Sequence, residues 1–311
     1  MLGNATDPRG AACRRALALR PDFPEAYVSL GVALYDQKRP KEAEAALRWA
    51  LELRPDFPGA YYNLGLALAD QRKYAGAEAA FRRALALRPD YPEAYHNLGV
   101  ALGKQKKLKE AVAAFRKADR LLPDHPLIRG NLRRHQRWLE LDGQFPDLLA
   151  GKARPAGPTE QLELAAFCLL YKEHYRAAAG FLADAFAAEP ELAGDLGAQH
   201  RYHAACSAAL AAAGKGEDAG RLPERVVLTL RRQALRWLRA DLAAYTALAG
   251  RDDPKLRQTI RQRLGHWQKD ADLAPVRDAE ALNKMPEYER DAWRKLWAGV
   301  EALRKKAGGK E

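Results

Sequence analysis

The sequence is poor in the residues that build nucleophilic or disulfide-rich sites. Its 311 residues include three cysteines, two methionines and only two serines, Ser29 and Ser207. Three scattered cysteines, Cys13, Cys168 and Cys206, exclude a disulfide framework and indicate a reducing, cytoplasmic setting. Neither serine lies in a G-x-S-x-G sequence, which excludes the nucleophile elbow of the α/β-hydrolases.

Signals for membrane insertion and for catalysis are also missing. No apolar run approaches the roughly 20 residues that cross a bilayer, and the N-terminus lacks the basic and apolar segments of a signal peptide. Phosphoryl transfer needs a Gly-rich loop, an H-R-D catalytic loop and a D-F-G sequence, and none of them occurs. The segment Gly214-Lys215-Gly216 lacks the spacing of a P-loop. The sequence therefore predicts a non-catalytic chain without a cofactor.

One set of residues invites a metal-binding interpretation. His200, His203 and Cys206 fall at positions i, i+3 and i+6 of one expected helix. A tetrahedral zinc site needs four ligands, and no fourth ligand and no CxxC or HExxH spacing accompanies these three. We therefore expect them to be packed or half-exposed helix residues, with no metal.

The net charge is strongly positive. The formal charge is +12, with a pI of about 9.6, and residues after 220 contain 21 Lys and Arg against 13 Asp and Glu. Such a balance attracts phosphate backbones. However, the basic residues alternate with apolar ones at helical spacing, as on a solvated helix face, and no nucleic-acid-reading motif accompanies them. The charge therefore favours an acidic protein partner over nucleic acid.

What the sequence has in abundance is a repeat. The string Pro24-Glu25-Ala26-Tyr27-x2-Leu30-Gly31 returns, with one change, from Pro58 and again from Pro92. The second half of each unit also recurs, as Ala43-x3-Leu47, Ala77-x3-Phe81 and Ala111-x3-Phe115. Each unit closes on a proline: Pro55, Pro89 or Pro123. Within each unit the apolar residues follow a helical period. Each unit therefore reads as two helices, and the glycines and alanines mark where they approach closely.

This pattern resembles the tetratricopeptide repeat, which has an aromatic residue, Leu-Gly, Ala and Pro at this period. The resemblance implies an all-α fold, an α-solenoid of helix hairpins with a C-terminal helical cap. Hairpins of this kind bury their apolar faces only against neighbouring hairpins.

We expect four segments along the chain. Residues 1–23 are the remnant second helix of a truncated repeat, which suggests a piece of a longer gene product, and 24–125 are three full repeats. Residues 126–220 are degenerate repeats, in which the loop signals Gly143–Pro146 and Gly151–Pro158 replace a second helix. Residues 221–311 are a basic, tryptophan-containing helical cap.

A second resemblance concerns the C-terminal half. The stretch 157–242 is similar to the tail of planctomycete-type bacterial serine/threonine protein kinases, in which a kinase domain precedes tetratricopeptide repeats. Within it, the run 230–242 carries the similarity, and two short runs further along, 266–273 and 293–297, share it. The resemblance implies an alternative function, in which this chain is the regulatory or substrate-recruiting arm of a larger kinase.

The candidate binding residues follow the repeat. Three of the five asparagines, Asn63, Asn97 and Asn131, recur at the repeat period, and Ser29 takes the same phase one unit earlier. In tetratricopeptide arrays this position faces the concave groove, where an amide can pair with a peptide backbone. Shared ancestry would produce the same spacing. With the neighbouring aromatic positions, the predicted peptide-binding set is Ser29, Tyr62, Asn63, His96, Asn97 and Asn131.

The sequence thus predicts a protein-interaction scaffold that binds an extended peptide segment. The two-carboxylate clamp of chaperone-binding relatives needs Lys and Asn where this chain has Val28 and Val32, so that specificity is not expected. The partner, the pathway and the oligomeric state are left open.

Overall fold

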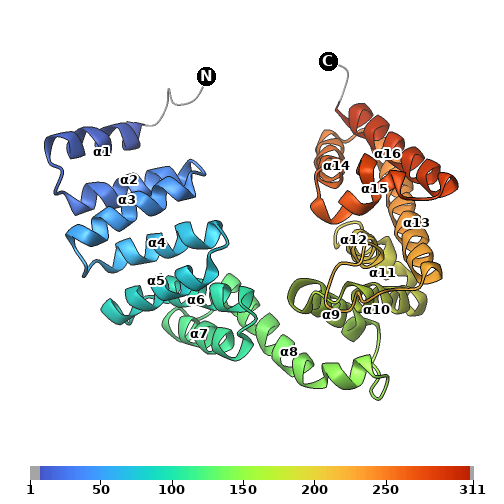
Figure 1. Cartoon of the computed structure of the whole chain (residues 1–311), viewed down its shortest axis with the longest axis horizontal. Coiled ribbons are helices and arrows are strands. Elements are labelled where there is room, and N and C mark those ends of the chain that lie inside the picture. The colour runs from blue at the N-terminus through green and yellow to red at the C-terminus, as the bar shows by residue number, and fades with distance from the viewer. Residues whose placement is uncertain (1–7, 309–311) are drawn as a thin grey trace. The chain divides into compact units, whose positions relative to one another are not determined.

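The computed structural model describes residues 8–308, which form sixteen α-helices and no strand (Figure 1). The chain divides into two compact units, residues 1–143 and 144–311. The helices that begin in the first unit are α1 (Pro8–Leu19), α2 (Pro24–Asp36), α3 (Pro40–Leu53), α4 (Pro58–Asp70), α5 (Tyr74–Leu87), α6 (Pro92–Lys104), α7 (Leu108–Leu121) and α8 (Pro126–Leu149).

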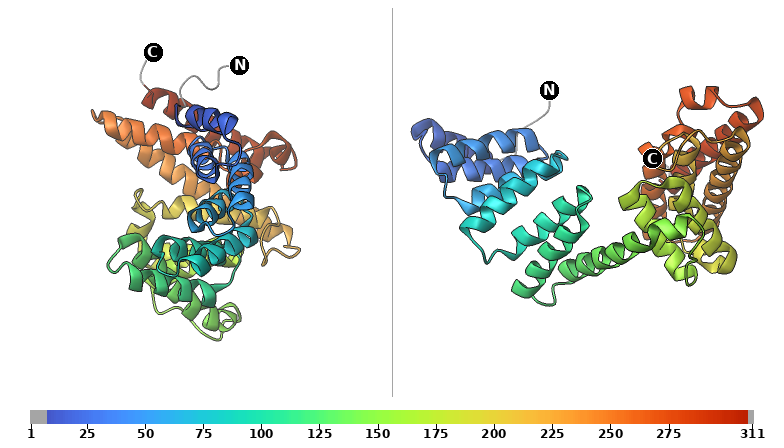
Figure 2. Two further views of the ribbon diagram at one scale, coloured as in Figure 1. Left: turned by 90° about the vertical axis from the view of Figure 1, so that its left-hand side faces the viewer. Right: turned by 60° about the horizontal axis from the view of Figure 1, so that its bottom comes forward.

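The first unit is a solenoid of helix hairpins, as predicted. Helices α2 and α3, α4 and α5, and α6 and α7 pair closely, and each second helix packs on the first helix of the next hairpin (Figure 2). Prolines at the first position of α2, α4 and α6 start these helices, because a proline there leaves no N–H unpaired and already has a helical φ.

Glycines allow the two helices of each hairpin to touch. A Cβ atom on Gly31 would lie 2.6 Å from Leu47 Cγ, and one on Gly99 would lie 2.8 Å from Phe115 Cε1. Leu47 and Phe115 are fully buried, so neither can retreat. The predicted close approach at the glycines is confirmed.

The turns inside the hairpins share one backbone conformation. Lys38, Arg72 and Lys106, which occupy the same position in successive repeats, all have φ near +60°. The next amide donates back to a carbonyl at the end of the preceding helix, for example Lys73 N to Leu68 O at 2.9 Å. This is the Schellman arrangement, which normally uses glycine at the left-handed position. A charged residue adopts the left-handed conformation here because packing between the two helices of the hairpin fixes their positions.

Helix α8 departs from the expected loop. The sequence predicted a loop at Gly143–Pro146, but α8 continues through Gly143 and Pro146 to Leu149. A proline inside a helix lacks one hydrogen bond and costs about 3 kcal/mol. Here Phe145 is buried and its ring lies 5.4 Å from Phe167 and 5.2 Å from His174. The prediction was wrong because burial of this aromatic outweighs the local breaking signal.

The second unit contains shorter helices in its first half. Its elements are α9 (Pro158–Phe167), a π-helical turn η1 (Cys168–Lys172), α10 (Tyr175–Ala188), α11 (Pro190–Gly194), α12 (His200–Ala212), α13 (Glu224–Ala249), α14 (Pro254–Trp267), the 3₁₀ helix η2 (Ala271–Val276), α15 (Ala279–Asn283) and α16 (Glu287–Ala307). The pairs α9–α10 and α12–α13 form hairpins, and the second of them joins the segment called degenerate repeats (126–220) to the segment called a cap (221–311).

Tryptophans fill the core of the second unit, as expected. Trp267 and Trp293 are fully buried and Trp237 nearly so. Trp297 packs at the edge and donates its indole N–H to Val276 O at 2.7 Å. An acidic cap starts α14, because the Asp253 carboxylate accepts from the first backbone amides of the helix, at 2.9 and 3.1 Å.

Candidate binding surface

The predicted binding residues lie on successive first helices of the solenoid, and we call them the first-helix row. They are Ser29 on α2, Tyr62 and Asn63 on α4, His96 and Asn97 on α6, and Asn131 on α8. Ser29 is exposed, the four residues on α4 and α6 are half-buried, and Asn131 is buried, at 8% exposed.

Two amides of the row connect neighbouring helices. Asn97 Nδ2 donates to the Tyr62 hydroxyl at 3.1 Å, and Asn131 Nδ2 lies 2.8 Å from His96 Nε2. Asn97 thus contacts the residue before Asn63, its equivalent in the previous repeat. Asn131 likewise contacts the residue before Asn97. Part of the hydrogen-bonding capacity that the sequence assigned to a ligand is therefore used to bind one repeat to the next.

Asn63 behaves differently because its neighbour is apolar. In the previous repeat, the residue equivalent to Tyr62, the partner of Asn97, is Val28, and its apolar side chain offers no acceptor. Asn63 Nδ2 donates instead to Gly59 O of its own helix, at 2.9 Å. A primary amide has two N–H hydrogens and an oxygen with two lone pairs. One of the two N–H hydrogens is occupied here.

Asn131 is the member least suited to a ligand. Besides its contact with His96, its Oδ1 accepts from Arg134 at 2.6 Å, and its backbone oxygen lies 2.8 Å from His135 Nδ1. The side chain is thus held on both its nitrogen and its oxygen. Among the predicted asparagines, Asn63 and Asn97 are the ones that combine partial exposure with remaining hydrogen-bonding positions.

The aromatic members of the row are packed and uncharged near neutral pH. The Tyr62 ring lies 4.8 Å from that of Tyr91, and burial together with Tyr91 and Glu93 raises the pKa of Tyr62 to about 12. The His96 ring lies 5.7 Å from Phe115, and burial lowers the pKa of His96 below its ordinary value. The row therefore presents neutral hydrogen-bonding groups on an aromatic base.

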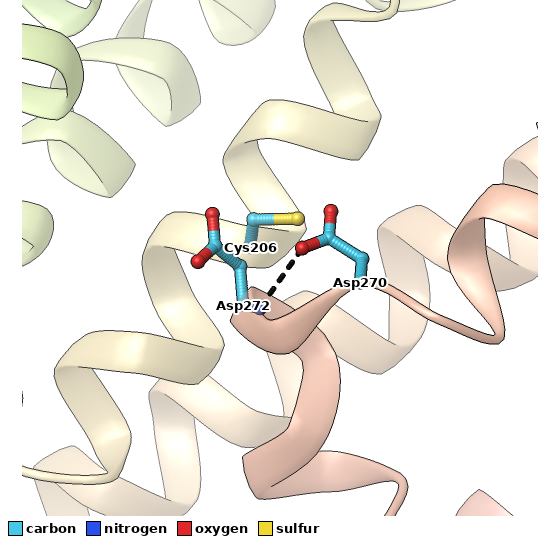
Figure 3. A group of neighbouring side chains, drawn as sticks. All are labelled: Cys206, Asp270 and Asp272. Carbon is cyan, nitrogen blue, oxygen red and sulfur yellow. Dashed lines mark hydrogen bonds between the residues drawn. The ribbon is translucent and has the colours of Figure 1, made fainter. Parts of the chain in front are cut away.

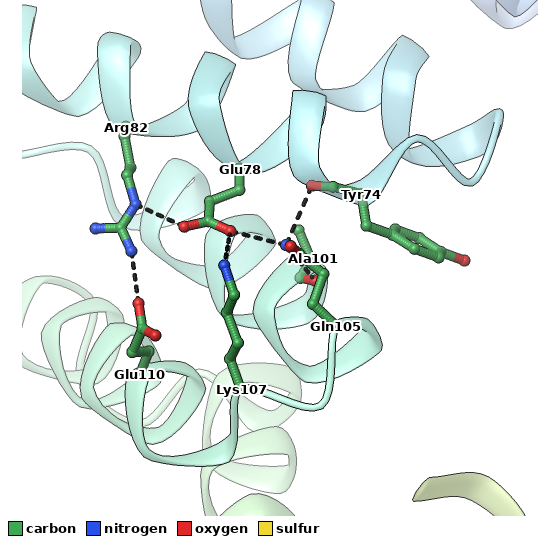
Figure 4. A network of polar contacts seen from close by, with 7 residues as sticks. All are labelled: Tyr74, Glu78, Arg82, Ala101, Gln105, Lys107 and Glu110. Carbon is green, nitrogen blue, oxygen red and sulfur yellow. Dashed lines mark hydrogen bonds and ion pairs between the residues drawn. The ribbon is translucent and has the colours of Figure 1, made fainter. Parts of the chain in front are cut away.

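A polar network beside the row was missed by the sequence reasoning (Figure 4). Gln105, at the end of α6, donates to Glu78 Oε2 on α5 at 2.8 Å, and Lys107 donates to the same oxygen at 2.9 Å. Arg82 connects Glu78 to Glu110 at 3.0 and 2.8 Å. The signal was in the sequence, since Gln71, Lys73 and Glu44 form the same arrangement in the preceding repeat.

The structure places His200, His203 and Cys206 on α12, as the helical spacing predicted. Among the residues described, one group of three side chains brings its possible ligand atoms within 4.8 Å of one another. It consists of Cys206, Asp270 and Asp272. His200 and His203 are not in that group. No helix between residues 8 and 308 combines the length and apolar character needed to span a bilayer.

Comparison with known proteins agrees with the repeat period. The tetratricopeptide repeat family model matches residues 2–58, 35–92 and 62–126. No curated protein sequence matches the chain.

Similar solved structures include the first TPR of Spaghetti (RPAP3) bound to an HSP90 peptide, at 25% identity and a TM-score of 0.37 over 38% of this chain and 93% of that one. They also include the Arabidopsis OM64 TPR domain, at 24% identity and a TM-score of 0.36 over 37% of this chain and 94% of that one. A MamA structure covers 60% of this chain and 89% of its own, at 20% identity and a TM-score of 0.37. From residue 8 to residue 126, the match to the tetratricopeptide repeat model and the packing of the helix hairpins coincide.

Proposed function

We propose that this chain is a protein-interaction scaffold and that its first unit binds an extended, acidic peptide segment along the first-helix row. The observation that carries the proposal is the alignment of half-buried amides, Asn63 and Asn97, in one phase on adjacent first helices. A primary amide can accept from a backbone N–H and donate to a backbone C=O, so it binds main chain regardless of the side chains.

Spacing supports an extended ligand. Packed helices lie about 8–10 Å apart, and about three residues of extended chain cover the same length at roughly 3.3 Å per residue. One peptide strand can therefore meet Ser29 on α2, Asn63 on α4 and Asn97 on α6 in turn. Each net amide–backbone hydrogen bond contributes about 1 kcal/mol, so several must act together.

Charge supports an acidic ligand. Residues 1–143 contain 25 Lys and Arg against 17 Asp and Glu, a net charge of +8. The row itself is neutral, so the positive field comes from the surrounding helices. Such a field accelerates encounter with an acidic segment and disfavours a basic one.

The proposal is tested with a peptide selected on the full chain from a displayed peptide library and measured by fluorescence polarisation. The double variant Asn63→Ala, Asn97→Ala should weaken binding at least several-fold, because two amide partners of the backbone are removed. The matched control is Asn283→Ala, an exposed asparagine on α15. Equal binding by the double variant and the control, or failure to select any peptide, would contradict the proposal.

The alternative, an arm of a larger serine/threonine kinase, stays a prediction from the similarity of residues 157–297 to kinase tails. The two proposals differ in the unit of the chain that binds the partner. A kinase arm would require residues 144–311 for substrate recruitment, whereas peptide binding to the row requires only residues of the first unit. Separate substitution in the two units distinguishes them.

A further inference from the structure

A group of possible metal ligands lies inside the second unit, away from the first-helix row in the sequence. Cys206 is on α12, Asp270 immediately precedes η2, and Asp272 lies within η2 (Figure 3). The sulfur and one carboxylate oxygen of each aspartate lie within 4.8 Å of one another. The Cys206 side chain is 2% exposed, and its sulfur points toward the Asp270 carboxylate.

The ligand atoms are held in place by neighbouring groups. Asp270 Oδ1 accepts from the Asp272 backbone amide at 2.9 Å, and the Tyr202 hydroxyl donates to Asp270 Oδ2. His266, one helical turn before Asp270, places Nε2 3.4 Å from Asp270 Oδ2. Partners of this kind orient the ligands of metal sites.

The group lacks a compensating positive charge. Between residues 8 and 308, no lysine or arginine forms an ion pair with Asp270 or Asp272, and the one ion-pair contact is that of His266. One oxygen of each carboxylate lies within 4.8 Å of the other and of the buried Cys206 sulfur, so the two negative charges repel each other. A bound cation would remove this repulsion and stabilise the thiolate.

We propose that Cys206, Asp270 and Asp272 bind one zinc ion, and that the exposed His266 side chain, whose Nε2 lies 3.4 Å from Asp270 Oδ2, turns inward to supply the fourth ligand. A thiolate ligand disfavours Mg²⁺ and Ca²⁺, whereas mixed sulfur, nitrogen and oxygen ligands in a set of four suit Zn²⁺. Tetrahedral bonds of about 2.0–2.3 Å bring ligand atoms closer together than they lie here, so the group contracts on binding. The ion joins α12 to the segment after α14 and has no open position for catalysis.

The test uses cobalt(II), a spectroscopic substitute for zinc, added to the full chain after removal of metal with a chelator. We expect one cobalt per chain and a sulfur-to-cobalt charge-transfer absorption that zinc abolishes by displacement. Cys206→Ser should lose this absorption, whereas Cys168→Ser, at an equally buried cysteine on η1, should keep it. No absorption in the unaltered chain, or absorption that survives in Cys206→Ser, overturns the proposal.

Two further variants keep the test decisive if Cys206→Ser fails to fold. Asp272→Asn changes a half-exposed side chain, and His266→Ala changes an exposed one. Each should lower zinc affinity at least tenfold, measured by competition with a chelating dye, while the helical circular dichroism spectrum stays unchanged. Zinc should also raise the thermal midpoint of the unaltered chain, because metal binding to the folded state adds to its stability. Unchanged affinity in both variants overturns the proposal.

Discussion

Single side chains decide whether the hairpins of the first unit can close. Gly99 faces the ring of Phe115, which is fully buried between α6 and α7, and no space is left for a methyl group. The position is therefore selected for the absence of a side chain and not for backbone flexibility, since it lies inside a helix. Asn97 shows a second residue-scale effect, because one amide serves both the contact with Tyr62 and the proposed ligand.

Gly99→Ala should destabilise the first unit by about 1–3 kcal/mol, because the added carbon overpacks against an immobile ring. The measurement is the free energy of unfolding in urea, followed by circular dichroism. Gly130→Ala is the matched control, since a Cβ there meets nothing within 4 Å and the residue lies inside α8. That change should be neutral or stabilise by up to about 1 kcal/mol. Equal effects of the two substitutions would refute the packing argument.

Connections between elements depend on the Gln–Lys–Glu network as well as on apolar packing. Glu78 on α5 accepts from Gln105, Lys107 and Arg82, and the side chain is only 13% exposed. Burial by itself raises the pKa of Glu78. These hydrogen bonds together lower the pKa by a larger amount, so the net shift is downward. The network ends at the next repeat because position 112 is a valine.

This shift gives the network a pH dependence. A carboxyl whose pKa is lower in the folded state stabilises the fold above its unfolded pKa, 4.5 for Glu78, and this contribution is lost as the pH falls through the folded value. Glu78→Gln should therefore lower stability at pH 7 by about 1 kcal/mol and reduce the loss of stability on acidification below pH 4.5. Urea titrations at several pH values measure both effects. Glu52→Gln, an exposed position on α3, is the control and should change neither. Parallel pH profiles for the Glu78 variant and the unaltered chain would contradict this role.

At the scale of the whole chain, there are two units with separate apolar cores, and each of the two proposed sites lies in a different unit. Residues 1–143 combine a regular solenoid with a net charge of +8, and residues 144–311 contain a core built around tryptophans. Each core is continuous within its own unit. The proposed peptide site therefore belongs to one unit and the proposed zinc site to the other, and variants in one test leave the second site intact.

The charge of the first unit predicts salt-sensitive binding. Affinity for an acidic peptide should fall several-fold between about 0.1 M and 1 M salt, because the screening length shrinks from about 10 Å to about 3 Å. Fluorescence polarisation across this range measures the effect. A peptide in which every Asp and Glu is replaced by Asn and Gln should bind with little salt dependence. If both peptides respond equally to salt, the charge of the first unit does not contribute to recognition.

The sequence alone determined the first seven helices, because repeated proline, glycine and alanine positions set where each helix starts, crosses its partner and ends. Local signals failed at Pro146, where the burial of Phe145 against residues that follow in the chain decides the conformation. Only the tertiary structure showed that Asn97 meets Tyr62 and that Cys206 meets Asp270, which lies far from it in the sequence. Such pairs depend on how helices pack against one another, and no pattern within a single helix records that packing.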